Sequence, residues 1–229
     1  MPRTVNAHAH RVRRAAFLDI AQQLIQTKGY EAMSIQDVLD ALNTSRGALY
    51  HYFDSKQALL EGVVDRFADG ALATLQPILD DRTLPAARKL EHVFNGIAQW
   101  KADRKDLVLA ILQIWTSDAN AIVREKVRRL TSQRLAPILA RIIQQGIDEG
   151  AFQIRSAEGT AMVVLALLQG MQELAVEQFV GRQKGTVSFE AVQATVPTFV
   201  EALERLLGLA PNSLTLPLTD AQTLRFWFG

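Results

Sequence analysis

Two short helical segments separated by three polar residues constrain the fold of this chain more than any other feature. Ser34 can cap a short helix whose apolar residues recur at helical spacing over 35–42. Asn43-Thr44-Ser45 then interrupts the pattern, and a second short helix is expected over about 46–52. Asn tolerates the left-handed conformation that a tight turn requires, and a hydroxyl of the turn can cap the next helix. The spacing therefore predicts a helix-turn-helix, supported by a longer helix that ends at Gly29.

The second short helix has an inward and an outward face. Leu49 and Phe53 are spaced to face inward. Gly47 lowers helix stability by roughly 1 kcal/mol relative to Ala, which suggests close approach to another molecule, with the DNA backbone as one candidate. The side chains left for outward contact are Arg46, Ala48, Tyr50 and His51.

Helical periodicity continues through the rest of the chain. Ser55 can cap a fourth helix, and longer helices are expected over about 85–102, 105–117, 119–148, 157–180 and 188–207. We therefore expect an all-α protein of about nine helices. Its expected parts are a three-helix helix-turn-helix head at 1–56, a larger helical body at 57–210 and a C-terminal tail at 211–229.

Composition excludes several classes of protein. The chain has no cysteine, so disulfides and thiolate metal sites are ruled out, and a reducing cytoplasm fits. The N-terminus lacks an apolar run that ends in a cleavage site, and the longest uncharged stretch, 159–172, falls short of the roughly 20 residues that cross a bilayer. We expect a soluble cytoplasmic protein without membrane contact.

Catalytic motifs are also missing from the sequence. The four histidines form no metal-binding helix pattern, and we find neither a glycine-rich phosphate loop nor a nucleophile elbow. His8 and His10 could hold a metal weakly in a flexible arm, but a solvated arm is the simpler interpretation. We therefore expect no enzyme, no metal and no cofactor.

Charge is unevenly distributed along the chain. Residues 1–29 carry five basic residues and one acidic residue, a net charge of +4, which leaves −3 on the other 200 residues because the whole chain carries +1. A basic end on a mildly acidic body is typical of contact with a polyanion at that end. A solvated basic arm without any partner would show the same charge pattern.

The helix-turn-helix segment resembles the TetR (tetracycline-repressor-like) family of regulators. The resemblance covers about residues 11–64 and is carried by 29–35, by 45–56, which reads S-x-G-x-L-Y-x-Y-F-x-S-K, and by Leu59-Leu60. This chain departs from the family pattern at Asn43, where glycine is usual, and at Leu39, where a small alanine is usual. The turn can accommodate Asn43, and Leu39 implies slightly different packing of its helix.

This resemblance implies a ligand-responsive transcriptional regulator that binds a palindromic operator as a homodimer and is released by a small-molecule effector. Repression is favoured over activation because an occluding dimer needs no contact with polymerase. Arg46 is the candidate for direct base reading, since an arginine fork matches guanine. The residues implied in DNA contact are Arg11, Arg13, Arg14, Ser34, Thr44, Ser45, Arg46, Ala48, Tyr50, His51, Tyr52 and Lys56.

The resemblance also implies a dimer surface and an effector pocket in the body. The apolar helices expected at 157–180 and 188–207 would form a four-helix bundle with those of a second copy, although both could instead complete a monomeric core. The candidate dimer residues are Val164, Leu168, Met171, Val192, Val196, Phe199, Val200 and Leu203. The candidate pocket residues, each of which could equally be core, are Phe94, Ile97, Trp100, Trp115, Met162 and Gln169.

The C-terminal tail ends in three aromatic residues, 226–228. We expect these rings to dock on the chain's own surface. The alternative is a binding site for a regulatory protein partner.

Overall fold

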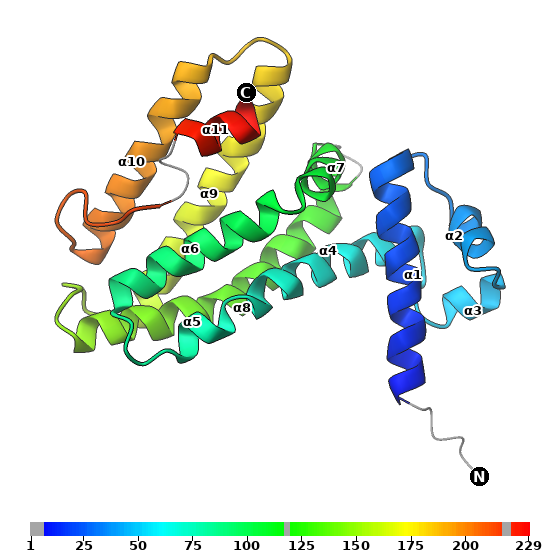
Figure 1. Cartoon of the computed structure of the whole chain (residues 1–229), viewed down its shortest axis with the longest axis horizontal. Helices are drawn as coiled ribbons and strands as arrows, with labels where there is room; N and C mark the ends of the chain where they lie inside the picture. The colour runs from blue at the N-terminus through cyan, green and yellow to red at the C-terminus, as the bar shows by residue number, and fades with distance from the viewer. Residues whose placement is uncertain (1–6, 117–119, 217–220) are drawn as a thin grey trace. The chain divides into compact units, whose positions relative to one another are not determined.

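The computed structural model describes residues 7–116, 120–216 and 221–229. The first six residues of the expected basic arm, with Arg3, and residues 217–220 of the tail lie outside the described residues. Within the described ranges the chain forms helices and connecting loops, without a strand, which confirms the predicted all-α class (Figure 1). The helices are α1 (Ala7–Lys28), α2 (Ile35–Ala41), α3 (Arg46–Tyr50), α4 (Lys56–Ala73), α5 (Gln76–Asp80), α6 (Ala86–Ala102), α7 (Lys105–Trp115), α8 (Ala121–Asp148), α9 (Ala157–Gln183), α10 (Phe189–Leu207) and α11 (Ala221–Phe228).

The nine helices predicted from periodicity are all present, and two short ones were not predicted. The first, α5, has only five residues, too few to give a periodic pattern. The second, α11, lies in the segment that we expected to be a C-terminal tail. Gly29 ends α1 with φ +82° and Gly208 ends α10 with φ +68°, a conformation in which a residue with a Cβ is strained.

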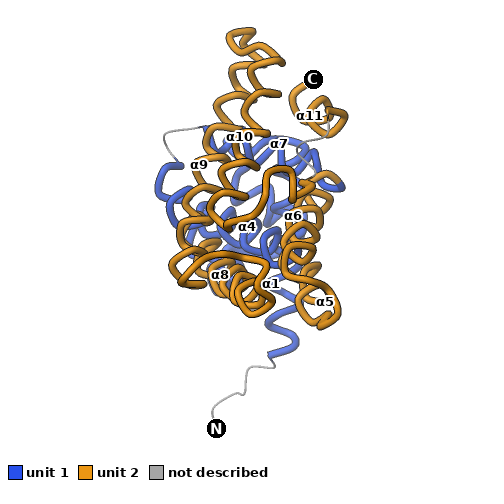
Figure 2. Tube along the Cα trace, turned by 90° about the vertical axis from the view of Figure 1, so that its left-hand side faces the viewer, with its two compact units in different colours: residues 1–70, 103–127 blue, residues 71–102, 128–229 orange. Residues whose placement is uncertain are grey.

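Contacts divide the chain into two compact units, which Figure 2 shows in different colours. One unit comprises residues 1–70 and 103–127, and the other comprises 71–102 and 128–229. Two of the three boundaries between the units fall within continuous helices, α4 and α8, and the third lies between α6 and α7. The bounds of these units differ from the predicted division at residues 56 and 210. That division into a DNA-binding head, an effector-binding body and a tail stays a prediction.

The first unit is built on a core that extends beyond the helix-turn-helix. Phe17 of α1, Leu49 of α3 and Val63 of α4 are completely buried, and Ile114 of α7 and Val123 of α8 belong to the same cluster. Burial of this apolar surface stabilises the head by removing it from water. The head therefore depends on helices that lie some 50 residues or more beyond α3 in sequence.

The second unit is a helical bundle whose core is closed by the chain after α10. Buried residues of α6, α8, α9 and α10 form this core, with Leu214 and Leu216 from the final segment. The buried carboxylate of Glu204 accepts hydrogen bonds from the backbone N–H groups of Asn212 (3.0 Å) and Leu214 (2.9 Å). These bonds hold the segment against α10 because they satisfy a buried charge.

The aromatic end of the chain docks on the chain itself, as the favoured expectation had it. Leu224 of α11 is buried in a small cluster with Val192 and Val196 of α10. Arg182 Nε of α9 donates a hydrogen bond of 3.1 Å to the carbonyl of Phe228, and α11 contacts both α9 and α10. The helix thus covers apolar side chains of α10 that would otherwise be exposed.

One described helix, α9, is long and apolar enough to cross a membrane by length and composition. Only 17% of its most apolar window is buried within the chain. Its inner side contributes Ala161, Val164 and Leu165 to the core of the second unit, whereas Met162 and Val163 are 60% and 52% exposed. The helix therefore has one face in the core and one apolar face toward solvent.

Candidate nucleic-acid interface

The helix-turn-helix begins with a capping box at the start of α2. The hydroxyl of Ser34 accepts a hydrogen bond from the backbone N–H of Asp37 (3.1 Å), and the Asp37 carboxylate accepts one from the N–H of Ser34 (2.7 Å). Lys28 Nζ lies 2.8 Å from the same carboxylate. The hydrogen bonds from Lys28 and Ser34 lower the pKa of Asp37 from 3.8 to about 2. Ser34, one of the residues implied in DNA contact, already uses its hydroxyl in this cap.

The turn has the geometry that its residues predict. Asn43 adopts φ +44°, and the N–H of Thr44 donates a hydrogen bond of 3.0 Å to the carbonyl of Leu39. Ser45, rather than Thr44, caps α3, because its hydroxyl accepts from the N–H of Ala48 at 3.3 Å. The Thr44 hydroxyl instead accepts a hydrogen bond of 2.8 Å from Arg13 Nη2, which connects α1 to the turn.

The outward face of α3 carries a cation, a glycine and an aromatic hydroxyl. Arg46 and Gly47 are exposed, and Tyr50 is 44% exposed, while Leu49 is fully buried beneath them. A Cβ atom built on Gly47 would meet no atom within 4 Å. His51 is exposed and Ala48 is half-buried. The face predicted for outward contact is therefore uncovered by the chain itself.

Some basic residues around this face contact other groups of the chain, and others do not. Lys56 Nζ donates a hydrogen bond of 3.1 Å to the carbonyl of Glu31 and lies 4.4 Å from the centre of the Tyr30 ring. The guanidinium of Arg14 stacks 5.1 Å from the centre of the Phe53 ring. No contact of Arg11 or Arg46 with another side chain is present in the described part of the chain, so these two cations remain available to a ligand.

Tyr52 has a different setting from the other predicted contacts. Its ring is half-buried and lies 5.6 Å from the centre of the Phe17 ring in the head core. It also lies 4.6 Å from the ring of His10 and 5.1 Å from that of His51. Tyr52 is thus part of the packing between α1 and the end of α3, and its contact with DNA remains a prediction.

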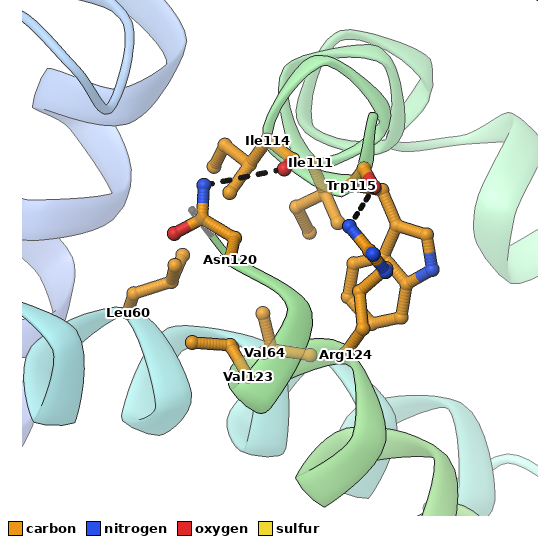
Figure 3. A pocket seen from close by; sticks show the side chains of 8 residues that line it. All are labelled: Leu60, Val64, Ile111, Ile114, Trp115, Asn120, Val123 and Arg124. Carbon is orange, nitrogen blue, oxygen red and sulfur yellow. Dashed lines mark hydrogen bonds between the residues drawn. The ribbon is translucent and has the colours of Figure 1, made fainter. Parts of the chain in front are cut away.

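A shallow apolar hollow lies within the first unit, between α4, α7 and the start of α8 (Figure 3). Two polar side chains close it. Asn120 Nδ2 donates to the carbonyl of Ile114 (3.3 Å), and Arg124 Nη1 donates to the carbonyl of Trp115 (2.7 Å). These bonds satisfy carbonyl groups at the end of α7. Nothing in the local sequence pattern distinguished Asn120 or Arg124, and sequence reasoning missed both.

The six predicted pocket residues belong to both units. Trp115 lines the hollow of the first unit, whereas the other five belong to the second unit. Phe94 and Ile97 pack on the core of that unit, and Gln169 is hydrogen-bonded to Arg128 and Ser132. Met162 is 60% exposed on α9, and its place in an effector pocket stays a prediction. The site of an effector stays a prediction.

Most of the predicted dimer residues are buried within the chain's own core. A buried side chain cannot contact a second copy, so the dimer assignment is corrected for Val164, Val192, Val196, Phe199, Val200 and Leu203, which are at most 7% exposed. Leu168 and Met171 are half-buried and pack against the same core. The error arose because an apolar stripe alone does not tell which partner covers it.

Comparison with known proteins matches two regions of the chain to family models. The sequence model of the bacterial regulatory proteins of the tetR family matches residues 17–63, and that of the tetracyclin repressor-like C-terminal domain matches residues 111–188. The chain is 25% identical over 131 residues to the HTH-type transcriptional repressor DhaR of Mycobacterium sp. strain GP1. That match covers 57% of this chain and 65% of DhaR, slightly less than two thirds of its length.

Two further relatives agree with these matches. The repressor KstR2 of Rhodococcus jostii RHA1 is 26% identical over 151 residues, or 62% of this chain and 68% of KstR2. A TetR transcription regulator of Haloarcula marismortui superposes with a TM-score of 0.61 over 86% of this chain and 97% of that one, at 20% identity. The latter likeness shows a shared fold. The chain belongs to the TetR family of bacterial regulatory proteins.

Proposed function

We propose that this protein is a transcriptional repressor that binds a palindromic operator as a homodimer and releases it when a small-molecule effector binds. Relatives named above are transcriptional repressors, and repression is the activity that their names record. A cytoplasmic location and the absence of catalysis follow from this role. The effector remains defined only as a small molecule.

The single observation that carries the proposal is the uncovered face of α3. Helix α3 rests on a buried leucine, its turn is fixed by hydrogen bonds, and it presents Arg46, Gly47 and Tyr50 to solvent. A rigid helix of two turns or less with an exposed arginine suits the major groove, which admits one helix and presents guanine acceptors. We assign base reading to Arg46 on this ground.

The basic residues other than Arg46 were all implied in DNA contact, but most of them have contacts within the chain. Lys56, Arg13 and Arg14 all have partners within the chain, so we propose that they hold the head together and act on phosphates only secondarily. Arg11 is exposed and has no such partner in the described residues, which makes it the stronger candidate for a phosphate contact.

A second copy is the occupant that we propose for the exposed face of α9. Insertion of α9 into a membrane would pull Ala161, Val164 and Leu165 out of the core, which disfavours a bilayer as the cover. Two copies of the head are also needed to read a palindrome with useful affinity. Met162 and Val163 replace the buried residues as candidates for this surface.

The function is tested by selecting bound duplexes from a random pool with purified protein at a stated salt concentration. The proposal predicts a palindromic site whose half-site centres lie about one helical turn apart, or a multiple of it. Enrichment of no sequence, at low ionic strength as well, would refute operator binding.

The dimer surface is tested separately by light scattering of Val163→Glu. A charge at this position should shift the protein toward the monomer, because an unpaired charge is costly to bury. Ile122→Glu is the matched control, since Ile122 is an exposed apolar residue of α8, at 76%, that we place outside the interface. An equal shift in both variants would refute the assignment.

A further inference from the structure

His10 lies where the N-terminal end of α1 meets the C-terminal end of α3. The side chains of residues 7–15 are all exposed except that of His10, which is half-buried. His10 is also the first member of the inward stripe of α1, seven residues before the fully buried Phe17. This end of α1 therefore extends past the head core and touches the rest of the unit mainly through one face.

The imidazole of His10 packs against rings at the end of α3. Its centre lies 4.6 Å from that of Tyr52, with the planes tilted by 42°, and 5.9 Å from that of His51 in an edge-on arrangement. The Tyr52 ring lies 5.6 Å from that of Phe17. These separations are within the range in which aromatic pairs attract each other. A continuous row of rings thus connects the start of α1 to the head core and to His51, the C-cap of α3.

The three arginines that follow His10 differ in whether they contact the head core. Arg13 and Arg14 are on the same inward stripe as His10, and their guanidinium groups lie 5.4 Å and 5.1 Å from the rings of Phe17 and Phe53. Arg11, one residue after His10, points off this stripe and is exposed. The position of its guanidinium depends on whether the first turns of α1 stay helical and docked.

We infer that His10 is a positioning residue for DNA binding, which fixes the start of α1 on Tyr52 so that Arg11 is held beside the exposed face of α3. The inference rests on the proposed operator binding. His10 acts through its ring surface, because the ring is packed between α1 and the end of α3, and Arg11 makes the contact with the phosphate. Base reading by Arg46 is independent of it.

The test compares His10→Ala, His10→Phe and Arg11→Ala in fluorescence anisotropy titrations with the selected duplex and a scrambled one. His10→Ala should weaken binding to both duplexes by roughly three- to tenfold. The plot of log affinity against log salt concentration should become shallower, with the magnitude of its slope smaller by up to about 0.9, the value for one lost phosphate contact. His10→Phe should restore both quantities because it keeps the ring. His92→Ala, an exposed histidine of α6, is the control without effect.

The double variant His10→Ala/Arg11→Ala separates positioning from direct contact. If His10 acts through Arg11, the double variant should bind like Arg11→Ala alone. Additive losses, or failure of His10→Phe to restore the salt slope, would overturn the inference and indicate a direct hydrogen bond to DNA. Wild-type protein that binds no duplex would instead refute the proposed function. Wild-type binding with an unchanged His10→Ala would refute the positioning role alone.

Discussion

Replacing Gly47 by alanine should stabilise the protein and weaken its binding to DNA. Gly47 lies in the first turn of α3 and is exposed. A Cβ atom at this position meets nothing within 4 Å, so the chain's own packing does not require a glycine here. Its φ also lies outside the left-handed region. The remaining reason for a glycine is a partner that comes close to the backbone of α3.

The two effects have different magnitudes. Alanine is favoured over glycine in a helix by about 0.5–1 kcal/mol, because glycine loses more backbone entropy on folding. In a chain of 229 residues this gain corresponds to a rise in melting temperature of roughly 1–4 °C. A methyl group placed between α3 and the DNA backbone should lower operator affinity by at least about tenfold, or ~1.4 kcal/mol.

The assay pairs thermal unfolding, followed by circular dichroism, with anisotropy titration of the selected operator. Gln133→Ala, an exposed residue of α8, is the control that should change neither quantity appreciably. A higher melting temperature together with weaker binding supports the reasoning. Full operator affinity in Gly47→Ala would show that no partner approaches this position, and a lower melting temperature would show that the chain itself needs the glycine.

Three further substitutions test the head. Arg46→Ala should lower operator affinity by about 1–3 kcal/mol and relax sequence preference, and equal losses on all sequences would refute its base-reading role. Gly62→Ala should lower the melting temperature, since its Cβ would lie 2.8 Å from Leu18 Cδ2 and 3.1 Å from Phe53 Cε1, and overpacking of about 1–3 kcal/mol exceeds the helix gain. Because folding lowers the pKa of Asp37 to about 2, its stabilising effect should be present above about pH 4 and lost toward pH 2. Asp37→Asn should therefore show a smaller decline in stability over that interval, as measured by urea unfolding at each pH.

Local features of the head could be predicted from the sequence because they depend on neighbouring residues. The left-handed Asn43, the caps at Ser34 and Ser45, and the buried Leu49 all follow from backbone preferences and helical spacing within ten residues or so. The same applies to the ends of α1 and α10, where Gly29 and Gly208 follow the last helical residue.

Contacts between distant segments could not be predicted in this way. The α7–α8 region contributes Ile114 and Val123 to the head core, and Asn120 closes the end of α7, although the intervening sequence gives no periodic signal for these pairings. The apolar stripe of α10 looked the same whether α11 or a second copy covered it. In the structure Leu224 of α11 packs with Val192 and Val196, and the core of the second unit takes up Phe199, Val200 and Leu203.

The central claim is that α3 of each of two copies lies in a DNA groove, and directed cleavage of DNA tests it most directly. The chain has no cysteine, so Asp54→Cys, an exposed position just after α3, gives one attachment site for an iron chelate that cuts nearby DNA strands. We predict two clusters of cuts in the selected operator, one in each half-site, about one helical turn or a multiple of it apart. Ile122→Cys, in α8, serves as the control label. An operator that is bound but not cut from position 54, or is cut at a single cluster, would contradict the account.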